Sequence, residues 1–167
     1  IANKRNESGR VPVYGSGGFV GKHDESLHPG PSIIIGRKGS VGSVYYIDKP
    51  FWCIDTAFYL ENINDNINID YLFRILKAID LNRFAIIVGV PGLNRTTLEQ
   101  IQIPLPPLPE QERIVHILQQ ADKLKHLRDE SFSIVQELFQ NLFLEMFGDP
   151  IFNPKNLPLV QLKEICT

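Results

Sequence analysis

The stretch that divides this chain of 167 residues is IQIPLPPLPEQERIVHI, residues 101–117. Four prolines fall between positions 104 and 109. Prolines remove backbone donors and disfavour helical geometry in the residues before them. We therefore expect an extended, fairly stiff connector over residues 104–109. It should separate a domain at residues 1–103 from a helix that starts at Glu110, because acidic side chains favour a helix start.

No glycine or proline occurs from Glu110 to Phe147, which predicts a helix of roughly 55 Å at about 1.5 Å per residue. Apolar residues recur along it at steps of three and four, as in a coiled coil, with an interruption at Arg128 and Ser131. One small domain cannot cover so long a stripe, so we expect a partner helix rather than a helix that folds back over its own domain. The residues expected to pair are Ile117, Leu124, Val135, Leu138 and Leu142.

The first hundred residues combine short apolar runs with turn residues, which predicts an α+β fold: a β-rich domain with short helices before the long helix. Residues 11–14 favour a strand that ends at Gly15-Ser16-Gly17-Gly18. A glycine loop in this place also occurs in cofactor sites, but Val20 stands where that fingerprint needs Gly or Ala, so a tight turn is favoured. Residues 33–47 are expected to form a hairpin. Further apolar runs follow at residues 51–60 and 86–90.

Two helical elements are expected before the connector. Residues 70–81 have apolar side chains at helical spacing, with Asn68 or Asp70 as the cap. Further on, Thr96 or Thr97 is expected to cap a short turn. Residues 148–167 begin with Gly-Asp-Pro, which ends the long helix, and they are expected to be a tail or the start of a following unit.

Composition alone does not indicate a nucleic-acid-binding protein. The chain has 43% hydrophobic and 22% charged residues and a formal net charge of −2, whereas DNA-binding proteins usually carry a basic excess. The charge is uneven, however, because residues 1–40 contain six Lys or Arg and three Asp or Glu. No apolar stretch approaches the roughly 18 residues of a membrane span and no signal peptide is visible, so a cytoplasmic protein is expected. The chain starts without Met, as a fragment does.

Motifs of catalysis and metal binding are missing from the sequence. Cys53 and Cys166 are far apart, which favours neither a zinc site nor a disulfide framework. The nuclease triplet Asp/Glu-x-Lys, the adenine methyltransferase motif, GxSxG, HExxH and the P-loop are not found. We therefore expect no catalytic residue, no metal and no cofactor in this chain. The histidines without metal-ligand spacing are His23, His28, His116 and His126.

Two polar loops carry the residues best suited to contact DNA. Arg37-Lys38-Gly39-Ser40 is short and basic, and residues 89–97 include Asn94 and Arg95. Arginine suits bidentate recognition of guanine, and lysine suits phosphates. A solvated hairpin turn and a helix-capping loop are the alternatives for the two segments. The candidate DNA contacts are Ser16, Lys22, Arg37, Lys38, Ser40, Asn94, Arg95 and Thr96.

The proline-rich junction with its Glu-Gln and following helix resembles the end of a target recognition domain in the specificity subunits of type I restriction-modification enzymes. Similar segments precede it, at Val13–Gly18 and Ile35–Gly42, and follow it, at Met146–Pro150 with Asn153-Pro154-Lys155. Leu159–Cys166 resembles the opening strand of a second recognition domain. A full subunit of the family has two recognition domains and two spacer helices, so this chain corresponds to a half-subunit or fragment.

The resemblance implies a sequence-specific DNA-binding subunit without catalysis of its own. In the family, each recognition domain reads one half of a split DNA sequence, and two antiparallel spacer helices set the gap between the halves. The implied partners are double-stranded DNA, methyltransferase subunits that hold S-adenosylmethionine and modify adenine, a restriction subunit, and a second recognition half or a second copy of the chain bound through the long helix.

Two other functions remain open from the sequence. The first is a coiled-coil interaction module without DNA specificity, which the net charge of −2 favours. The second is a small cofactor-binding enzyme that uses Gly15-Ser16-Gly17. Salt-insensitive binding would support the former, and binding of S-adenosylmethionine or a dinucleotide to the isolated chain the latter.

Overall fold

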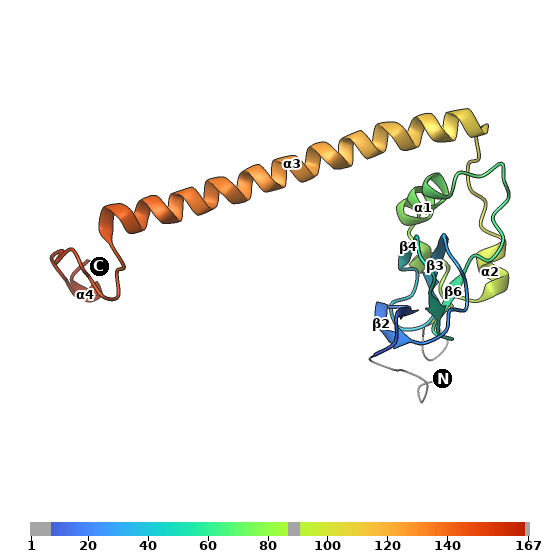
Figure 1. Cartoon of the computed structure of the whole chain (residues 1–167), viewed down its shortest axis with the longest axis horizontal. Coiled ribbons are helices and arrows are strands. Elements are labelled where there is room, and N and C mark those ends of the chain that lie inside the picture. The colour runs from blue at the N-terminus through green and yellow to red at the C-terminus, as the bar shows by residue number, and fades with distance from the viewer. Residues whose placement is uncertain (1–7, 87–90, 166–167) are drawn as a thin grey trace. The chain divides into compact units, whose positions relative to one another are not determined.

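The structure is a computed structural model that describes residues 8–86 and 91–165 (Figure 1). The chain divides into two compact units, Ile1–His116 and Ile117–Thr167. The first unit contains two small sheets and short helices. A helix of 40 residues, Leu108–Phe147, begins in the first unit and ends within the second. The predicted α+β class, with a β-rich domain before one long helix, is confirmed. In the described residues, no helix is both long and apolar enough to cross a membrane.

The first unit contains two three-stranded sheets. In one, β1 (Val11–Gly15) lies between antiparallel β2 (Gly18–His23) and parallel β5 (Trp52–Cys53). In the other, β3 (Ser32–Gly36) is the centre, with β4 (Val44–Ile47) and β6 (Ala57–Tyr59) antiparallel on its two sides. The expected hairpin over residues 33–47 is therefore present as β3 and β4. The glycine segment 15–18 is the tight turn between β1 and β2.

Strand β3 is the centre of the hydrophobic core because all five of its residues are buried. Alternate side chains point to opposite faces of a strand. Ile33 and Ile35 accordingly pack in a cluster with Leu72 and Leu76, whereas Ile34 packs in a second cluster with Phe51 and Cys53. Each fully buried side chain of this size contributes about 1.5–3 kcal/mol to folding. Burial also raises the pKa of the Cys53 thiol to about 11, so the thiol is protonated at neutral pH.

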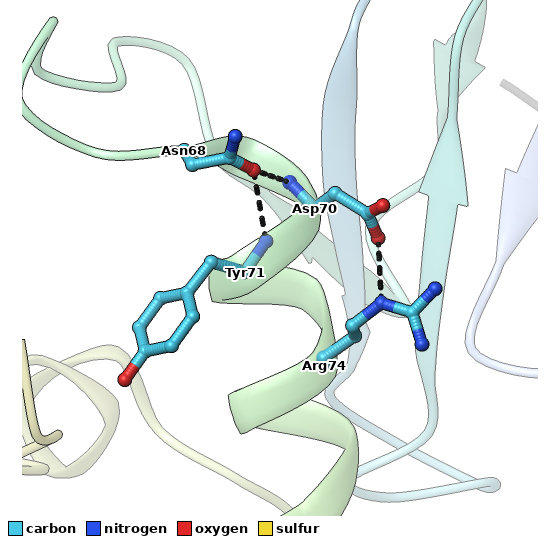
Figure 2. Close-up of polar contacts among 4 residues, drawn as sticks. All are labelled: Asn68, Asp70, Tyr71 and Arg74. Atoms are coloured by element: carbon cyan, nitrogen blue, oxygen red, sulfur yellow. Dashed lines mark hydrogen bonds and ion pairs between the residues drawn. The ribbon is translucent and has the colours of Figure 1, made fainter. Parts of the chain in front are cut away.

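Helix α1 (Ile69–Ala78) supplies the other side of the first cluster. The Asn68 side chain caps it by accepting hydrogen bonds from the backbone N–H groups of Asp70 and Tyr71, at 3.0 and 3.1 Å (Figure 2). The Arg74 guanidinium donates to the Asp70 carboxylate one turn earlier, at 3.1 Å (Figure 2). The predicted cap at Asn68 is thus confirmed, and the helix begins where an asparagine can satisfy its first donors.

Several predicted elements end or divide differently in the structure. Helix α1 stops at Ala78 rather than continuing to residue 81, and a 3-10 turn, η2 (Leu81–Phe84), follows because the Asp80 side chain accepts from the N–H of Asn82. The apolar run 51–60 is divided between two sheets by a turn at residues 55 and 56. Of the strand expected at 86–90, Ile86 pairs with Gly92, and residues 87–90 lie outside the described part.

Two side chains hold the proline-rich connector against the rest of the first unit. Tyr71 donates its hydroxyl hydrogen bond to the carbonyl of Pro104 at 3.0 Å. Gln111 is 1% exposed, and its amide donates to the carbonyls of Asn66 and Pro106, at 3.0 and 2.8 Å, while its oxygen accepts from the N–H of Asn68 at 2.9 Å. The glutamine of the Glu-Gln motif is therefore a structural tie between the start of the long helix and the segment before α1.

Helix α3 (Leu108–Phe147) starts two residues earlier than expected. Leu108 and Pro109, which are expected in an extended connector, lie instead in the first helical turn. Proline is compatible with the first turn because the N–H that it lacks has no partner inside the helix there. At about 1.5 Å per residue, α3 is roughly 60 Å long.

A compact turn follows α3. Gly148 has φ +75°, a left-handed conformation that favours glycine, and its N–H returns to the carbonyl of Leu144 at 2.8 Å. The opening strand expected at residues 159–166 is wrong for the described residues, because a helical turn, α4 (Leu162–Ile165), forms there instead. A strand needs a neighbouring strand for its hydrogen bonds, and residues 148–165 contain no strand that could pair with one at this position. Cys166 lies outside the described residues.

Candidate nucleic-acid interface

Three loops that are far apart in the sequence meet at one place in the first unit: the turn 15–18, the loop 37–43 and the segment 91–96. We call them together the loop cluster. Lys38 pairs with Gly92 in a β-bridge, and the N–H of Leu93 donates to the carbonyl of Arg37 at 2.9 Å. The Ser43 hydroxyl donates to the carbonyl of Ser16. The structure therefore joins the two polar loops singled out in the sequence and adds the glycine turn to them.

Arg37 is the best-anchored cation of the loop cluster. Its backbone N–H donates to the carbonyl of Thr56 at 2.9 Å, and its guanidinium carbon lies 5.4 Å from the centre of the Phe58 ring. Arginine stacks well on aromatic faces, and such stacking restricts the side chain before any ligand binds. Arg37 as a residue is thus half-buried, and its planar donor fork is partly oriented by Phe58, as a base-reading side chain needs to be.

Lys38 and Ser40 are exposed at the tip of the loop 37–43. The tip is shaped by glycines. Gly39 has φ +79°, a left-handed conformation that favours glycine. At Gly36, a Cβ would overlap the carbonyl oxygen of Ser40, so the loop folds back closely over the end of β3. An ammonium group at such an exposed, glycine-flanked tip suits contact with a phosphate.

The N-terminal end of α2 carries three further candidates. Asn94 caps α2 (Arg95–Glu99) by accepting from the N–H of Thr97 at 2.6 Å, so the cap is Asn94 and not Thr96 or Thr97 as expected. Asparagine is among the best capping residues. Arg95 is exposed and donates to the Glu99 carboxylate at 2.7 Å, and this hydrogen bond raises the pKa of Arg95. Thr96 is exposed.

Two sequence candidates are placed less favourably. Ser16 is 9% exposed, and its backbone holds the cluster together: its N–H donates to the Thr56 hydroxyl oxygen at 3.3 Å, and its carbonyl accepts from Ser43 and Tyr45. Lys22 is exposed on β2 opposite Pro12, roughly 13 Å along the strand from the turn at Gly18. The structure does not bring Lys22 into the loop cluster.

Sequence reasoning missed three residues that support the loop cluster: Ser43, Thr56 and Phe58. Thr56 accepts with its backbone carbonyl from the N–H groups of Arg37 and Lys38, and with its hydroxyl oxygen from Ser16. None of these residues stands in a motif. The contacts of Thr56 and Phe58 with Arg37 depend on the pairing of β3 with β6, which nothing in the local sequence marks.

Comparison with known proteins shows the family to which this chain belongs. Residues 1–130 match the family described as Type I restriction modification DNA specificity domain. The chain belongs to this family. The resemblance drawn from the proline-rich junction is therefore confirmed, and with it the prediction of a specificity subunit rather than an enzyme.

Curated relatives agree with the family match. The chain is 31% identical over 125 residues to the type I restriction enzyme EcoprrI specificity subunit of Escherichia coli. The aligned region covers 74% of this chain and 31% of that protein. It is 27% identical over 135 residues to the type I restriction enzyme MjaVIII specificity subunit of Methanocaldococcus jannaschii. Here the aligned region covers 80% of this chain and 29% of the relative. The chain thus spans about a third of the length of these two relatives.

Solved structures share the fold. The S subunit of a type I restriction-modification system from M. genitalium superposes with a TM-score of 0.65 and 19% identity, covering 91% of this chain and 42% of that one. A chain from a structure of the assembly and conformational transition of the type I R-M system gives a TM-score of 0.64 and 20% identity, covering 84% of this chain and 39% of that one. At such identities the likeness concerns the fold alone.

The long helix of this specificity domain carries the second predicted interface. Every residue from His116 to Phe147 is exposed, apolar ones included. The residues expected to pair with another helix have exposed fractions from 43% to 68%. They are Ile117, Leu124, Val135, Leu138 and Leu142. Stripes of exposed apolar residues of this length mark interaction surfaces.

Proposed function

We propose that this chain reads one part of a double-stranded DNA target through the loop cluster, as the target recognition domain of a type I specificity subunit. One observation carries the proposal: the loop cluster unites Arg37, Lys38 and the Asn94-Arg95 segment, although the whole chain has a net charge of −2. Cations gathered in one place give a local positive field, which attracts DNA independently of the net charge.

The candidate residues fit different roles in such a complex. Arg37, which is held over Phe58, suits a bidentate contact to the O6 and N7 atoms of guanine. Lys38 and Ser40 at the exposed loop tip suit phosphate contacts, which fix position and not sequence. Arg95 and Thr96 on the first turn of α2 suit either kind of contact. Ser16 and Lys22 remain candidates with weaker support, because one is buried and the other lies away from the cluster.

The remaining partners follow from the family. We propose that the chain assembles in the cytoplasm with methyltransferase subunits, which bind S-adenosylmethionine and modify adenine, and with a restriction subunit, while this chain supplies recognition. Helix α3 pairs with a second recognition half or a second copy of the chain. Because a paired helix of roughly 60 Å is a stiff rod, it holds two recognition domains at a fixed separation along the DNA.

The role of Arg37 is tested by Arg37→Ala, with Lys22→Ala as the matched control on a cation outside the cluster. The complex of this chain with a methyltransferase subunit is tested for binding to two duplexes. One is the target duplex, obtained by selection from a random pool, and the other has a scrambled sequence. We expect Arg37→Ala to weaken target binding by about 1–3 kcal/mol and to change scrambled binding little, because a base contact is lost. Lys22→Ala should have a smaller effect on both duplexes. An equal loss by Arg37→Ala on the two duplexes would assign Arg37 to a phosphate contact and refute its reading role.

A second candidate function is an interaction module that uses α3 without contacting DNA. The exposed apolar residues of α3 and the net charge of −2 favour it. Salt separates the two functions, since release of counterions from DNA makes affinity fall steeply as salt rises. If the affinity of the complex for DNA stays the same between about 50 and about 200 mM salt, the interaction module is favoured.

A further inference from the structure

The 3-10 turn η2 (Leu81–Phe84) borders the loop cluster at Gly42, a residue of the loop 37–43. A Cβ at Gly42 would lie 2.9 Å from the backbone nitrogen of Asn82 and 3.0 Å from the backbone carbonyl carbon of Leu81. The backbone of the loop and the backbone of η2 are therefore in direct contact, without side chains between them. Gly42 also has φ +75°, so both its conformation and this contact favour glycine.

The residues after η2 make a second connection to the loop cluster. The N–H of Ile86 donates to the carbonyl of Gly92 at 2.8 Å, and the N–H of Gly92 donates back to the carbonyl of Ile86 at 3.3 Å. Gly92 is in turn paired with Lys38. Since paired strands lie about 4.8 Å apart, Ile86 stands about 10 Å from Lys38. This distance is close to the width of the DNA major groove, about 12 Å.

The backbone of Arg83 is held in place by the structure of the turn. Leu81 is 1% exposed and belongs to the first hydrophobic cluster, so it anchors η2 in the core. The Asp80 carboxylate accepts from the N–H of Asn82 at 3.2 Å, and the carbonyl of Asn82 accepts from the N–H of Ala85 at 3.0 Å. Arg83 therefore presents its side chain from a fixed and anchored turn.

The loop cluster and η2 together carry three arginines, and their charges are balanced differently. The guanidinium of Arg37 lies over an aromatic ring. Arg95 donates to the Glu99 carboxylate at 2.7 Å, so its charge already has a partner. Arg83 is exposed and forms no ion pair with any residue in the described part of the chain. A free cation attracts an anionic ligand more strongly than a cation that a carboxylate already balances.

We propose that Arg83 is a further DNA-contacting residue, and that it binds a backbone phosphate beside the groove that Arg37 enters. The inference rests on DNA reading in the proposed function and adds a contact that fixes the position of the domain on the duplex. A side chain about one groove width from the loop 37–43 meets the phosphates that border the groove. Phosphate contacts hold a protein in register on DNA without reading its sequence. Arg83, rather than Arg95, is then the main cation that flanks Arg37.

The inference is tested by the salt dependence of DNA binding. The complex of this chain with a methyltransferase subunit is titrated with the selected duplex and with a scrambled duplex, between about 50 and about 200 mM salt. We expect Arg83→Ala to weaken binding to both duplexes by a similar factor, roughly fivefold to tenfold near 0.1 M salt. The slope of log affinity against log salt should become shallower by about 0.9, because one phosphate contact is lost. Arg83→Lys should keep most of the affinity, since an ammonium also binds phosphate.

Two other arginines serve as matched controls. Arg10 is exposed and precedes β1 at the end of the strand away from the glycine turn, roughly 17 Å along the chain from Gly15. Arg10→Ala should therefore change neither the affinity nor the salt slope appreciably. Arg95→Ala should cost less affinity than Arg83→Ala, because Glu99 already balances the charge of Arg95. Denaturant midpoints of all variants are compared, and Arg83→Ala should keep its midpoint because the side chain is exposed.

The outcomes separate this inference from the proposed function. An unchanged affinity and salt slope in Arg83→Ala, or a larger loss in Arg95→Ala, refutes the phosphate contact and leaves reading by Arg37 in place. A loss on the selected duplex alone that Arg83→Lys does not restore also refutes it, because a phosphate contact acts on every sequence. If the unchanged complex binds both duplexes equally well and Arg83→Ala weakens both, the phosphate contact is supported and sequence reading by the loop cluster is refuted.

Discussion

Gly36→Ala should disrupt the loop cluster and lower the free energy of unfolding of the first unit by about 2–3 kcal/mol. Gly36 ends β3, and a Cβ there would overlap the carbonyl oxygen of Ser40 and lie 2.5 Å from the hydroxyl oxygen of Ser43. One of these is a backbone atom that cannot rotate away, so the loop 37–43 must move. Arg37 and Lys38 would then lose their present positions, and binding of the target should fall together with stability.

The matched control for this substitution is Gly17→Ala. A Cβ at Gly17 would meet the Ser40 hydroxyl oxygen at 3.8 Å, an ordinary contact, although Gly17 belongs to the same loop cluster. Denaturant midpoints of both variants are compared with that of the unchanged chain, and their binding to the selected duplex is measured in the complex. Equal small effects of the two substitutions would contradict the close folding of the loop over Gly36.

Gln111→Ala should lower the free energy of unfolding by about 2–4 kcal/mol, because it removes the three hydrogen bonds that the buried Gln111 side chain makes to backbone groups. These are the carbonyls of Asn66 and Pro106 and the N–H of Asn68, the residue whose side chain caps α1. Gln136→Ala on the exposed part of α3 is the control and should change stability little. Denaturant unfolding measures both, and equal values would contradict the tie between α3 and the segment before α1.

Gln111→Glu refines this prediction through its pH dependence. The glutamate would face two carbonyl oxygens in a buried place, so its pKa in the folded chain should rise above the unfolded value. The protonated form can donate one hydrogen bond, and the ionised form none. A group with a raised pKa contributes stability at low pH and loses it as the pH rises. The difference between this variant and the unchanged chain should therefore be smaller at acidic pH than at neutral pH.

Much of the fold was predictable because its signals are local. The β3–β4 hairpin follows from two apolar runs around a polar turn, and Asn68 stands directly before residues with helical spacing. Helix α3 starts two residues before the expected position, because the first turn of a helix accepts a proline that its interior would not. The division of residues 51–60 between two sheets was not predictable, since it depends on which distant strands they pair with.

The candidate site was predictable in its residues but not in its arrangement. Arg37, Lys38, Asn94 and Arg95 were identified from residue type and loop context. Their convergence depends on contacts across more than fifty residues, such as the hydrogen bond from Leu93 to Arg37. The net charge of −2 gives no indication of the candidate site, because it averages the loop cluster with the acidic half of α3. The apolar residues of α3 were predictable as a helical pattern because helical periodicity is local.

The most direct test of the central claim is selection of bound duplexes from a random pool by the complex of this chain with its methyltransferase subunit. We predict that the bound pool becomes enriched in one short sequence per recognition domain, at a constant spacing when two domains are held by paired helices. The Arg37→Ala complex should change the base preference at one or a few positions of that sequence. A bound pool with the same composition as the input would contradict DNA reading by the loop cluster.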